Sequence, residues 1–98
     1  MKLIQEIDIT LGRNPLSFSN HVRFVHVFKT TPKFKLVVEV DRNIPLKEPV
    51  EFLVFTEPSG TLYTGKANYI DSFYPPYGES SGLHFFWILA RDEEKPEV

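Results

Sequence analysis

Histidine and carboxylate side chains are the groups in this chain that could bind a metal ion or transfer a proton. The three histidines are His21, His26 and His84. His21 and His26 are five residues apart, so on a regular strand they point to opposite faces and cannot bind one ion together. His84 could join either of them across a strand pair, with Glu39 or Asp41 as a further ligand for zinc. A strand-borne histidine is more often packed or solvated, so we predict no metal site.

Other groups suited to catalysis or cofactor binding are sparse. Asp92, Glu93 and Glu94 lie in a charged terminal stretch, where water screens them, and Asp71 is the only acid expected to be shielded from water. A general acid needs such shielding or a like-charged neighbour. The five glycines form no phosphate-binding loop, and the lack of cysteine excludes thiolate metal sites and disulfides. We therefore predict that the protein is not an enzyme and has no cofactor.

The stretch Gly78–Gly82 satisfies the pattern G-x-S-x-G, which surrounds the nucleophilic serine of α/β-hydrolases. That chemistry needs a strand before the serine, a helix after it and a wide parallel sheet beneath. Here Pro75 and Pro76 precede the stretch, the strand-like run LHFFWILA follows it, and 98 residues are too few for that fold. The stretch therefore predicts a flexible turn.

The segment from Ile70 to Gly82 is unusual for a loop, because loops cross the surface and are usually polar. Aromatic rings stiffened by proline present apolar contact area at low entropic cost, as the central residues of protein interfaces do. We predict a contact surface for a protein partner or a second copy of the chain, extended by Tyr63 and Tyr69. Its residues are Phe73, Tyr74, Pro75, Pro76 and Tyr77. In the alternative, the segment folds back and caps one open end of the core.

Single-stranded nucleic acid is the second ligand that the sequence suggests. Such binders combine a cationic groove with aromatic rings on which bases stack. The candidate cations lie in segment 21–35, interleaved with Phe24, Phe28 and Phe34. They are Arg23, Lys29, Lys33 and Lys35. On regular strands these cations and rings fall on opposite faces, which is typical of core phenylalanines beside solvated cations, and the sequence pI near 5.9 does not favour this function.

Charge is unevenly distributed along the chain, whose net charge is −2. Residues 9–38 carry five basic side chains and no acidic ones, whereas residues 39–98 carry five basic and eleven acidic ones. This asymmetry favours either a basic face for an acidic partner or basic and acidic strands that compensate each other side by side. The start of the chain lacks the apolar core of a signal peptide, and no run approaches a membrane span. We therefore expect a cytoplasmic protein.

Apolar residues alternate with a period of two along most of the chain, which predicts strands. The predicted strands are 3–11, 21–29, 33–41, 50–56, 61–70 and 83–91, the last being central because both of its faces are apolar. Residues 12–20 contain Gly, Pro, Asn and Ser and predict a loop, whereas Pro45 and Pro49, which cannot donate to a ladder, predict a connector at 43–49. Glu57–Gly60 predicts a turn that joins 50–56 and 61–70 into a hairpin.

The stretch PVEFLVFTEPSGTLYTG resembles the hairpins of immunoglobulin-like modules over about a sixth of the chain. This resemblance implies an immunoglobulin-like topology. We therefore expect an all-β protein, a single small sandwich of about six or seven antiparallel strands, with a small β-barrel as the alternative. One domain is expected over residues 1–91, followed by a charged tail at 92–98. The function expected of it is that of a non-catalytic interaction or assembly module.

Overall fold

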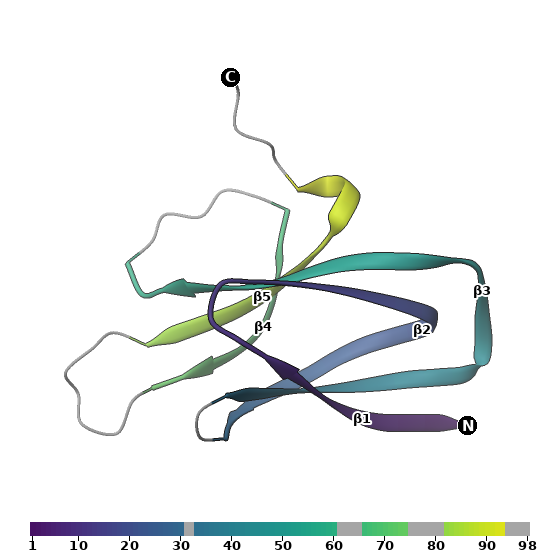
Figure 1. The fold of residues 1–98 in the computed structure, drawn as a ribbon, viewed down its shortest axis with the longest axis horizontal. Coiled ribbons are helices and arrows are strands. Elements are labelled where there is room, and N and C mark those ends of the chain that lie inside the picture. Colours follow the sequence, from purple (N-terminus) through teal and green to yellow (C-terminus); the bar gives the residue numbers. More distant parts are fainter. Residues whose placement is uncertain (31–32, 61–65, 75–81, 94–98) are drawn as a thin grey trace.

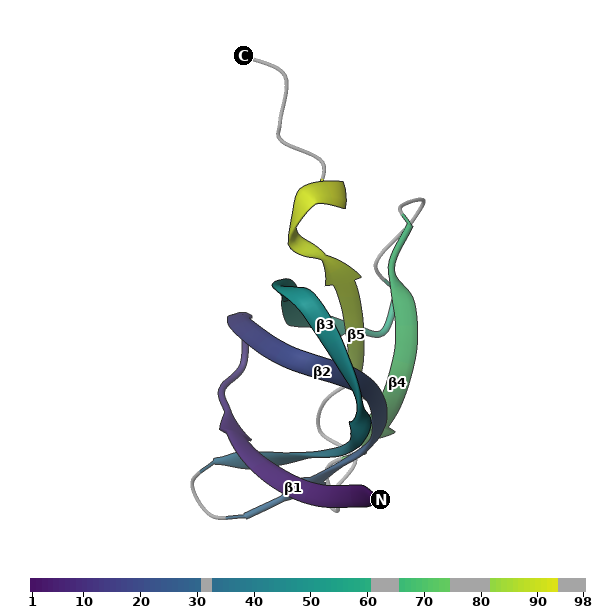
Figure 2. The same ribbon diagram turned by 90° about the vertical axis from the view of Figure 1, so that its right-hand side faces the viewer.

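Period-two alternation produces strands along most of the chain, and the computed structural model contains one antiparallel sheet of five strands (Figure 1). The structure describes residues 1–30, 33–60, 66–74 and 82–93. The strands are β1 (Lys2–Ile9), β2 (Arg13–Lys29), β3 (Phe34–Pro58), β4 (Asn68–Phe73) and β5 (Leu83–Leu89), and a 3-10 helix, η1 (Ala90–Asp92), follows β5. The sheet curls into a half-barrel (Figure 2). This arrangement confirms the predicted all-β fold of the sandwich and small-barrel class.

Strands β2 and β3 form a long hairpin that bends in the middle and contributes to both halves of the half-barrel. The first half of β3 lies between β1 and the second half of β2. Its second half lies between the first half of β2 and β5, and β4 extends the sheet beyond β5. At the bend Asn20 lies opposite Pro45 while His21 lies opposite Asp41, so residues 42–44 have no counterpart on β2. Extra residues on one strand bend it, as Figure 1 shows for β3.

The bend explains why five strands replace the six or seven expected. The predicted loop at 12–20 and connector at 43–49 were both wrong, because β2 and β3 continue through them.

Pro15 is tolerated within β2 for a geometric reason. The Thr56 N–H donates to the Gly12 carbonyl oxygen at 3.2 Å, and alternate residues of a strand point toward the same neighbour. Pro15 therefore faces the open edge of β2, where its missing N–H removes no ladder hydrogen bond.

The predicted hairpin between residues 50–56 and 61–70 was also wrong. Over residues 52–55, β2 occupies one edge of β3 and β5 occupies the other. Strand β4 pairs with β5 and not with β3. The turn after Pro58 does form, with Gly60 at a φ of 90°, but the neighbour of β3 comes from farther along the chain. The central position predicted for 83–91 is confirmed, since β5 lies between β3 and β4.

A bulge in β2 changes which side chains share a face. Phe24 lies opposite Val38 and His26 lies opposite Val37, so Val25 has no counterpart. Alternation shifts by one residue at this point. Val27 therefore enters the core at 5% exposure, and His26 moves to the outer face. The prediction that His21 and His26 lie on opposite faces was wrong, because the inserted residue places both on the outer face.

The concave face of the half-barrel holds the core. Phe85, Leu36, Val38 and Val54 are fully buried at its centre, with Ile9 beside them. A second group of rings, Phe18, Phe24, Phe52 and Trp87, packs mainly edge to face with centroids 5.2–6.1 Å apart. Edge-to-face contacts are favourable because the positive edge of one ring meets the negative face of another. The core therefore joins both halves of the bent hairpin to β5.

Candidate functional site

Phe73, the first residue of the predicted contact surface, is the last residue of β4 and belongs to the edge of the core. It lies opposite Leu83 on β5 and is half-buried. Its ring meets the buried Phe34 edge to face, with centroids 5.5 Å apart. Packing against the core is what the capping alternative expects of this residue.

Tyr74 behaves differently, although it follows Phe73 directly. Its side chain is 66% exposed, and its ring lies edge-on to the His84 ring at 6.0 Å. The ring also covers Gly82: a Cβ there would lie 2.4 Å from Tyr74 Cε1, so only glycine permits this approach. Pro75, Pro76 and Tyr77 lie outside the described residues, as do the first four residues of the G-x-S-x-G stretch and Tyr63.

His84 on β5 is the centre of a chain of hydrogen bonds that sequence analysis did not foresee. Its Nδ1 lies 2.7 Å from Ser72 Oγ, and its Nε2 lies 2.7 Å from Ser59 Oγ. The Ser59 hydroxyl reaches the Gly82 carbonyl oxygen at 3.2 Å, and the Tyr69 hydroxyl lies 2.5 Å from Ser72 Oγ. In one consistent assignment, the Tyr69 hydroxyl donates to Ser72 Oγ and the Ser72 hydroxyl donates to His84 Nδ1. His84 Nε2–H then donates to Ser59 Oγ, and the Ser59 hydroxyl donates to the Gly82 carbonyl oxygen.

These contacts define a continuous aromatic and polar area on β4 and β5, which we name the Tyr69–Tyr74 surface. Tyr69 is 59% exposed and packs edge to face on Phe86 with centroids 5.9 Å apart. The members of the surface are Tyr69, Ser72, Tyr74, His84 and Phe86. Hydrogen bonds and ring contacts hold the two tyrosines in place while most of their area stays accessible. Exposed tyrosines fixed in this way are suited to contact with another protein.

Asp71, the acid expected to be shielded from water, joins β4 to β2. One carboxylate oxygen accepts the Val27 N–H at 2.9 Å and lies 2.8 Å from His26 Nδ1, and the other accepts the Ser72 N–H at 2.8 Å. Partial burial is the largest single influence on its pKa and raises it. The two backbone donors and His26 together outweigh burial, so the pKa of Asp71 lies below its ordinary value of 3.8. The carboxylate therefore connects two strands that share no ladder among the described residues.

Two of the four cations proposed for nucleic-acid binding form ion pairs. Arg23 lies 3.2 Å from Glu39, and Lys35 lies 2.7 Å from Asp8. The hydrogen bond and charge of Lys35 hold the pKa of Asp8 below its usual range. The basic segment thus lies beside acidic side chains, which is the compensating arrangement considered from the sequence.

The remaining two cations lie at the end of the β2–β3 hairpin. Lys29 Nζ lies 4.6 Å above the Phe34 ring, a cation–π distance. Lys33 is exposed, and its carbonyl oxygen accepts a hydrogen bond from the Thr30 N–H at 2.7 Å. The bulge places Phe28 on the outer face, where it lies opposite Lys35 and stacks on His26 at 5.7 Å. Phe28 therefore shares a face with Arg23 and Lys35, contrary to the expectation, whereas Phe24 and Phe34 face the core.

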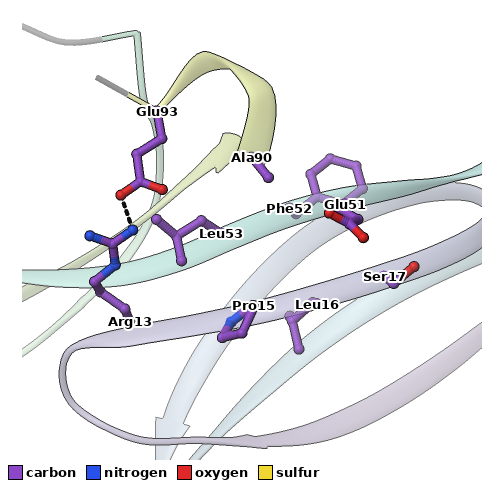
Figure 3. Close-up of a pocket in the computed structure, with 9 residues that line it drawn as sticks. All are labelled: Arg13, Pro15, Leu16, Ser17, Glu51, Phe52, Leu53, Ala90 and Glu93. Carbon is purple, nitrogen blue, oxygen red and sulfur yellow. Dashed lines mark hydrogen bonds and ion pairs between the residues drawn. The ribbon is translucent and has the colours of Figure 1, made fainter. Parts of the chain in front are cut away.

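A groove of about 360 Å³ lies between the first half of β2, β3 and η1 (Figure 3). Pro15, Leu53 and Ala90 supply apolar walls, and an ion pair between Arg13 and Glu93 lies at one end. The two charged residues are 80 positions apart, so no sequence pattern could have paired them. The paired Glu93 belongs to the stretch predicted as a charged tail.

Metal binding and membrane insertion can be checked within the described parts of the chain. There, no three His, Asp or Glu side chains gather in a way that could hold a metal ion. His26 binds Asp71 and His84 binds two serines, so neither ring is directed at the other. Over the same residues, the structure contains no helix of the length and apolarity needed to cross a membrane.

Comparison with protein-family models, with curated proteins and with solved structures found no match to this chain.

Proposed function

We propose that the protein is a non-catalytic interaction or assembly module whose protein partner binds the Tyr69–Tyr74 surface. The observation that carries the proposal is the exposure of Tyr69 and Tyr74, at 59% and 66%, on rings that other side chains hold in place. A tyrosine that is already ordered loses little entropy when a partner covers it. Its hydroxyl gives direction to a contact that is otherwise apolar.

Phe73 is left out of the surface proposed here because its ring belongs to the edge of the core. Phe73 packs on Phe34, so replacing it would disturb the core and confuse a loss of binding with a loss of folding. Tyr69 and Tyr74 are exposed, so replacing them tests the surface alone. The contact surface proposed here is therefore centred on these two residues, with His84 between them.

The double variant Tyr69→Ser/Tyr74→Ser is expected to lose partner binding while remaining folded. Surface substitutions change stability by about 0.5 kcal/mol or less, which for a domain of this size is about 2–4 °C in Tm. The measurement is capture of proteins from the native host by immobilised full chain, followed by mass spectrometry and by direct titration of the captured partner.

Ile44→Ser is the matched control, because Ile44 is an exposed apolar residue at the bend, away from β4. It should retain the partner that the double variant loses. Undiminished binding by a folded double variant would contradict the proposal. A fall in Tm of more than about 10 °C in the double variant would instead favour the capping alternative.

Binding of single-stranded nucleic acid by segment 21–35 is the alternative function. One observation favours it: Phe28 and the stacked His26 share the outer face with Arg23 and Lys35. Each of these cations already pairs with an acid, however, and a phosphate would have to displace Glu39 or Asp8. Displacing these pairs would offset part of the binding energy.

A labelled single-stranded oligonucleotide, titrated at low and at moderate salt, is therefore expected to show no binding to the full chain. Nucleic-acid binding through phosphate contacts weakens steeply as salt rises. Tight binding at low salt that weakens with salt, and that Arg23→Ala/Lys35→Ala reduces, would establish the alternative function.

A further inference from the structure

Strand β1 has an edge that no described residue pairs with. β1 pairs with β3 over eight residues in one uninterrupted register. Its other edge lies at the rim of the half-barrel (Figures 1 and 2). The Arg42 N–H donates to the Met1 carbonyl oxygen at 3.1 Å, so Met1 and alternate residues after it point toward β3. The backbone groups of Lys2, Ile4 and Glu6 therefore point to the open edge.

The β1 edge differs from the open edges of β4, which contains a bulge at Ile70, and of the first half of β2. Natural proteins protect sheet edges with proline, bulges or charges that repel a second strand. The first half of β2 has Pro15 at its open edge, as described above. β1 contains neither proline nor a bulge, and it exposes Leu3 at 40% and Ile4 at 59%. It is a regular, partly apolar strand of a kind that can accept another strand.

The charges on this edge are complementary to themselves. Lys2 and Glu6 lie on the same face, two residues either side of Ile4. If two copies of β1 pair antiparallel about a two-fold axis at Ile4, each Lys2 lies opposite Glu6 of the second copy. Ile4 then lies opposite Ile4, and the outward backbone groups of all three residues meet their counterparts. Glu6 makes no ion pair with any described residue. Lys2 lies 3.3 Å from Glu39 on β3, and its exposed ammonium would lie between Glu39 and Glu6 of the second copy.

A neighbouring register is less favourable. Pairing about Gln5 would place Lys2 opposite Asp8 and Glu6 opposite Ile4. Asp8 is already bound to Lys35 at 2.7 Å, and Glu6 would lie against an apolar side chain. The register about Ile4 leaves the Asp8–Lys35 pair intact and buries the most exposed apolar residue within β1.

We infer that the chain forms a two-fold homodimer in which β1 of one copy pairs antiparallel with β1 of the other, centred on Ile4. The two half-barrels then share one continuous sheet. This interface is separate from the Tyr69–Tyr74 surface, so the dimer and the proposed partner can be tested independently.

Sedimentation equilibrium of the full chain over a range of concentrations should give a dimer. Glu6→Lys places like charges opposite each other twice, and it should raise the dissociation constant of the dimer at least about tenfold. The double swap Lys2→Glu/Glu6→Lys restores opposite charges across the axis and should recover part of the affinity, because Lys2→Glu also removes the ion pair with Glu39. Ile4→Lys should give a monomer, and Ile44→Lys, the control at the bend, should remain dimeric.

Circular dichroism and Tm measured on each variant will show that the monomers are folded, as expected for substitutions at exposed positions. A wild-type chain that stays monomeric at high concentration overturns the inference. So does a dimer that Tyr69→Ser/Tyr74→Ser dissociates and Ile4→Lys does not. Failure of the charge swap to recover any affinity overturns the register.

Discussion

Replacing Phe34 with alanine is expected to lower the free energy of unfolding by about 3–5 kcal/mol. Phe34 is 4% exposed at the start of β3. Its ring meets Phe85 at 5.2 Å and Phe73 at 5.5 Å, so truncation leaves a cavity between β3, β4 and β5. A loss of this size is a large share of the stability of a domain of about 100 residues.

Urea unfolding followed by fluorescence measures this effect, because Trp87 is the only tryptophan and packs among Phe24 and Phe52. Phe34→Leu keeps much of the volume and should cost less, about 1–2 kcal/mol. Leu11→Ala, at a residue 56% exposed, is the surface control and should change stability by about 0.5 kcal/mol or less. A loss below about 1 kcal/mol for Phe34→Ala would mean that the three strands do not share one core.

Asp71→Ala is expected to lower the free energy of unfolding by about 1–3 kcal/mol, because it leaves buried or half-buried donors without an acceptor. Those donors are the N–H groups of Val27 and Ser72, and Val27 is itself a core residue. Asp71→Asn retains an oxygen that can accept one of the two bonds, so it should cost less. Urea unfolding at neutral pH measures both variants, and equal stability of wild type and Asp71→Ala would contradict the role assigned to the carboxylate.

The contribution of Asp71 also depends on pH, in a direction that its pKa sets. Its pKa in the folded protein lies below the ordinary value of 3.8, so folding favours the ionised form. The resulting stabilisation is complete above the unfolded-state pKa and is lost as pH falls through the folded-state pKa. The stability difference between wild type and Asp71→Asn should therefore narrow in acid, below about pH 4. A difference that stays constant from neutral pH to acid would show that the charge makes no contribution.

Sequence analysis predicted the class of fold because period-two alternation is a local property. Residues 34–40 show it in its clearest form, and they pair with β1 in one uninterrupted register. The bulge at Val25 could not be predicted, because an inserted residue leaves no mark on a run such as HVRFVHVF, which is apolar on both faces. That one residue places Val27 in the core and His26 on the outer face. It therefore puts His26 on the same face as His21, and Phe28 on the same face as Arg23 and Lys35.

The partner of each strand was harder to predict than the strand itself. The sequence Glu57–Gly60 correctly indicated a turn, but a turn determines only that the chain reverses. Which strand then lies beside β3 depends on burial, and the most apolar strand, β5, occupies that place. The predicted hairpin rested on local signals alone, whereas the observed pairing places the buried Val54 opposite Trp87 of the apolar β5.

The candidate site could be predicted in part. The sequence put Tyr74 in a predicted contact surface that Tyr69 extends, with a segment folded back over the core as the alternative, and both tyrosines are exposed in the structure. The polar groups that hold them were not expected. Ser59 and His84 are 25 positions apart and Asp71 and His26 are 45 apart, and only the folded sheet brings each pair within hydrogen-bond distance.

The central position of β3 in both halves of the sheet has a consequence for how the protein opens. All the ladder hydrogen bonds of β1 are made to β3, and β5 and β4 are joined to β1 by ladders only through β3, whereas Asp71 links β4 directly to β2. The two halves use different residues of β3 for their ladders, so their opening is coupled by the core that they share, in which Leu36 and Val38 lie with Val54 and Phe85. Successive amide groups in the middle of each arm of β3 donate alternately to the strand on one side and to the strand on the other. We therefore expect the amide protons of these residues to exchange with solvent more slowly than those of the edge strands.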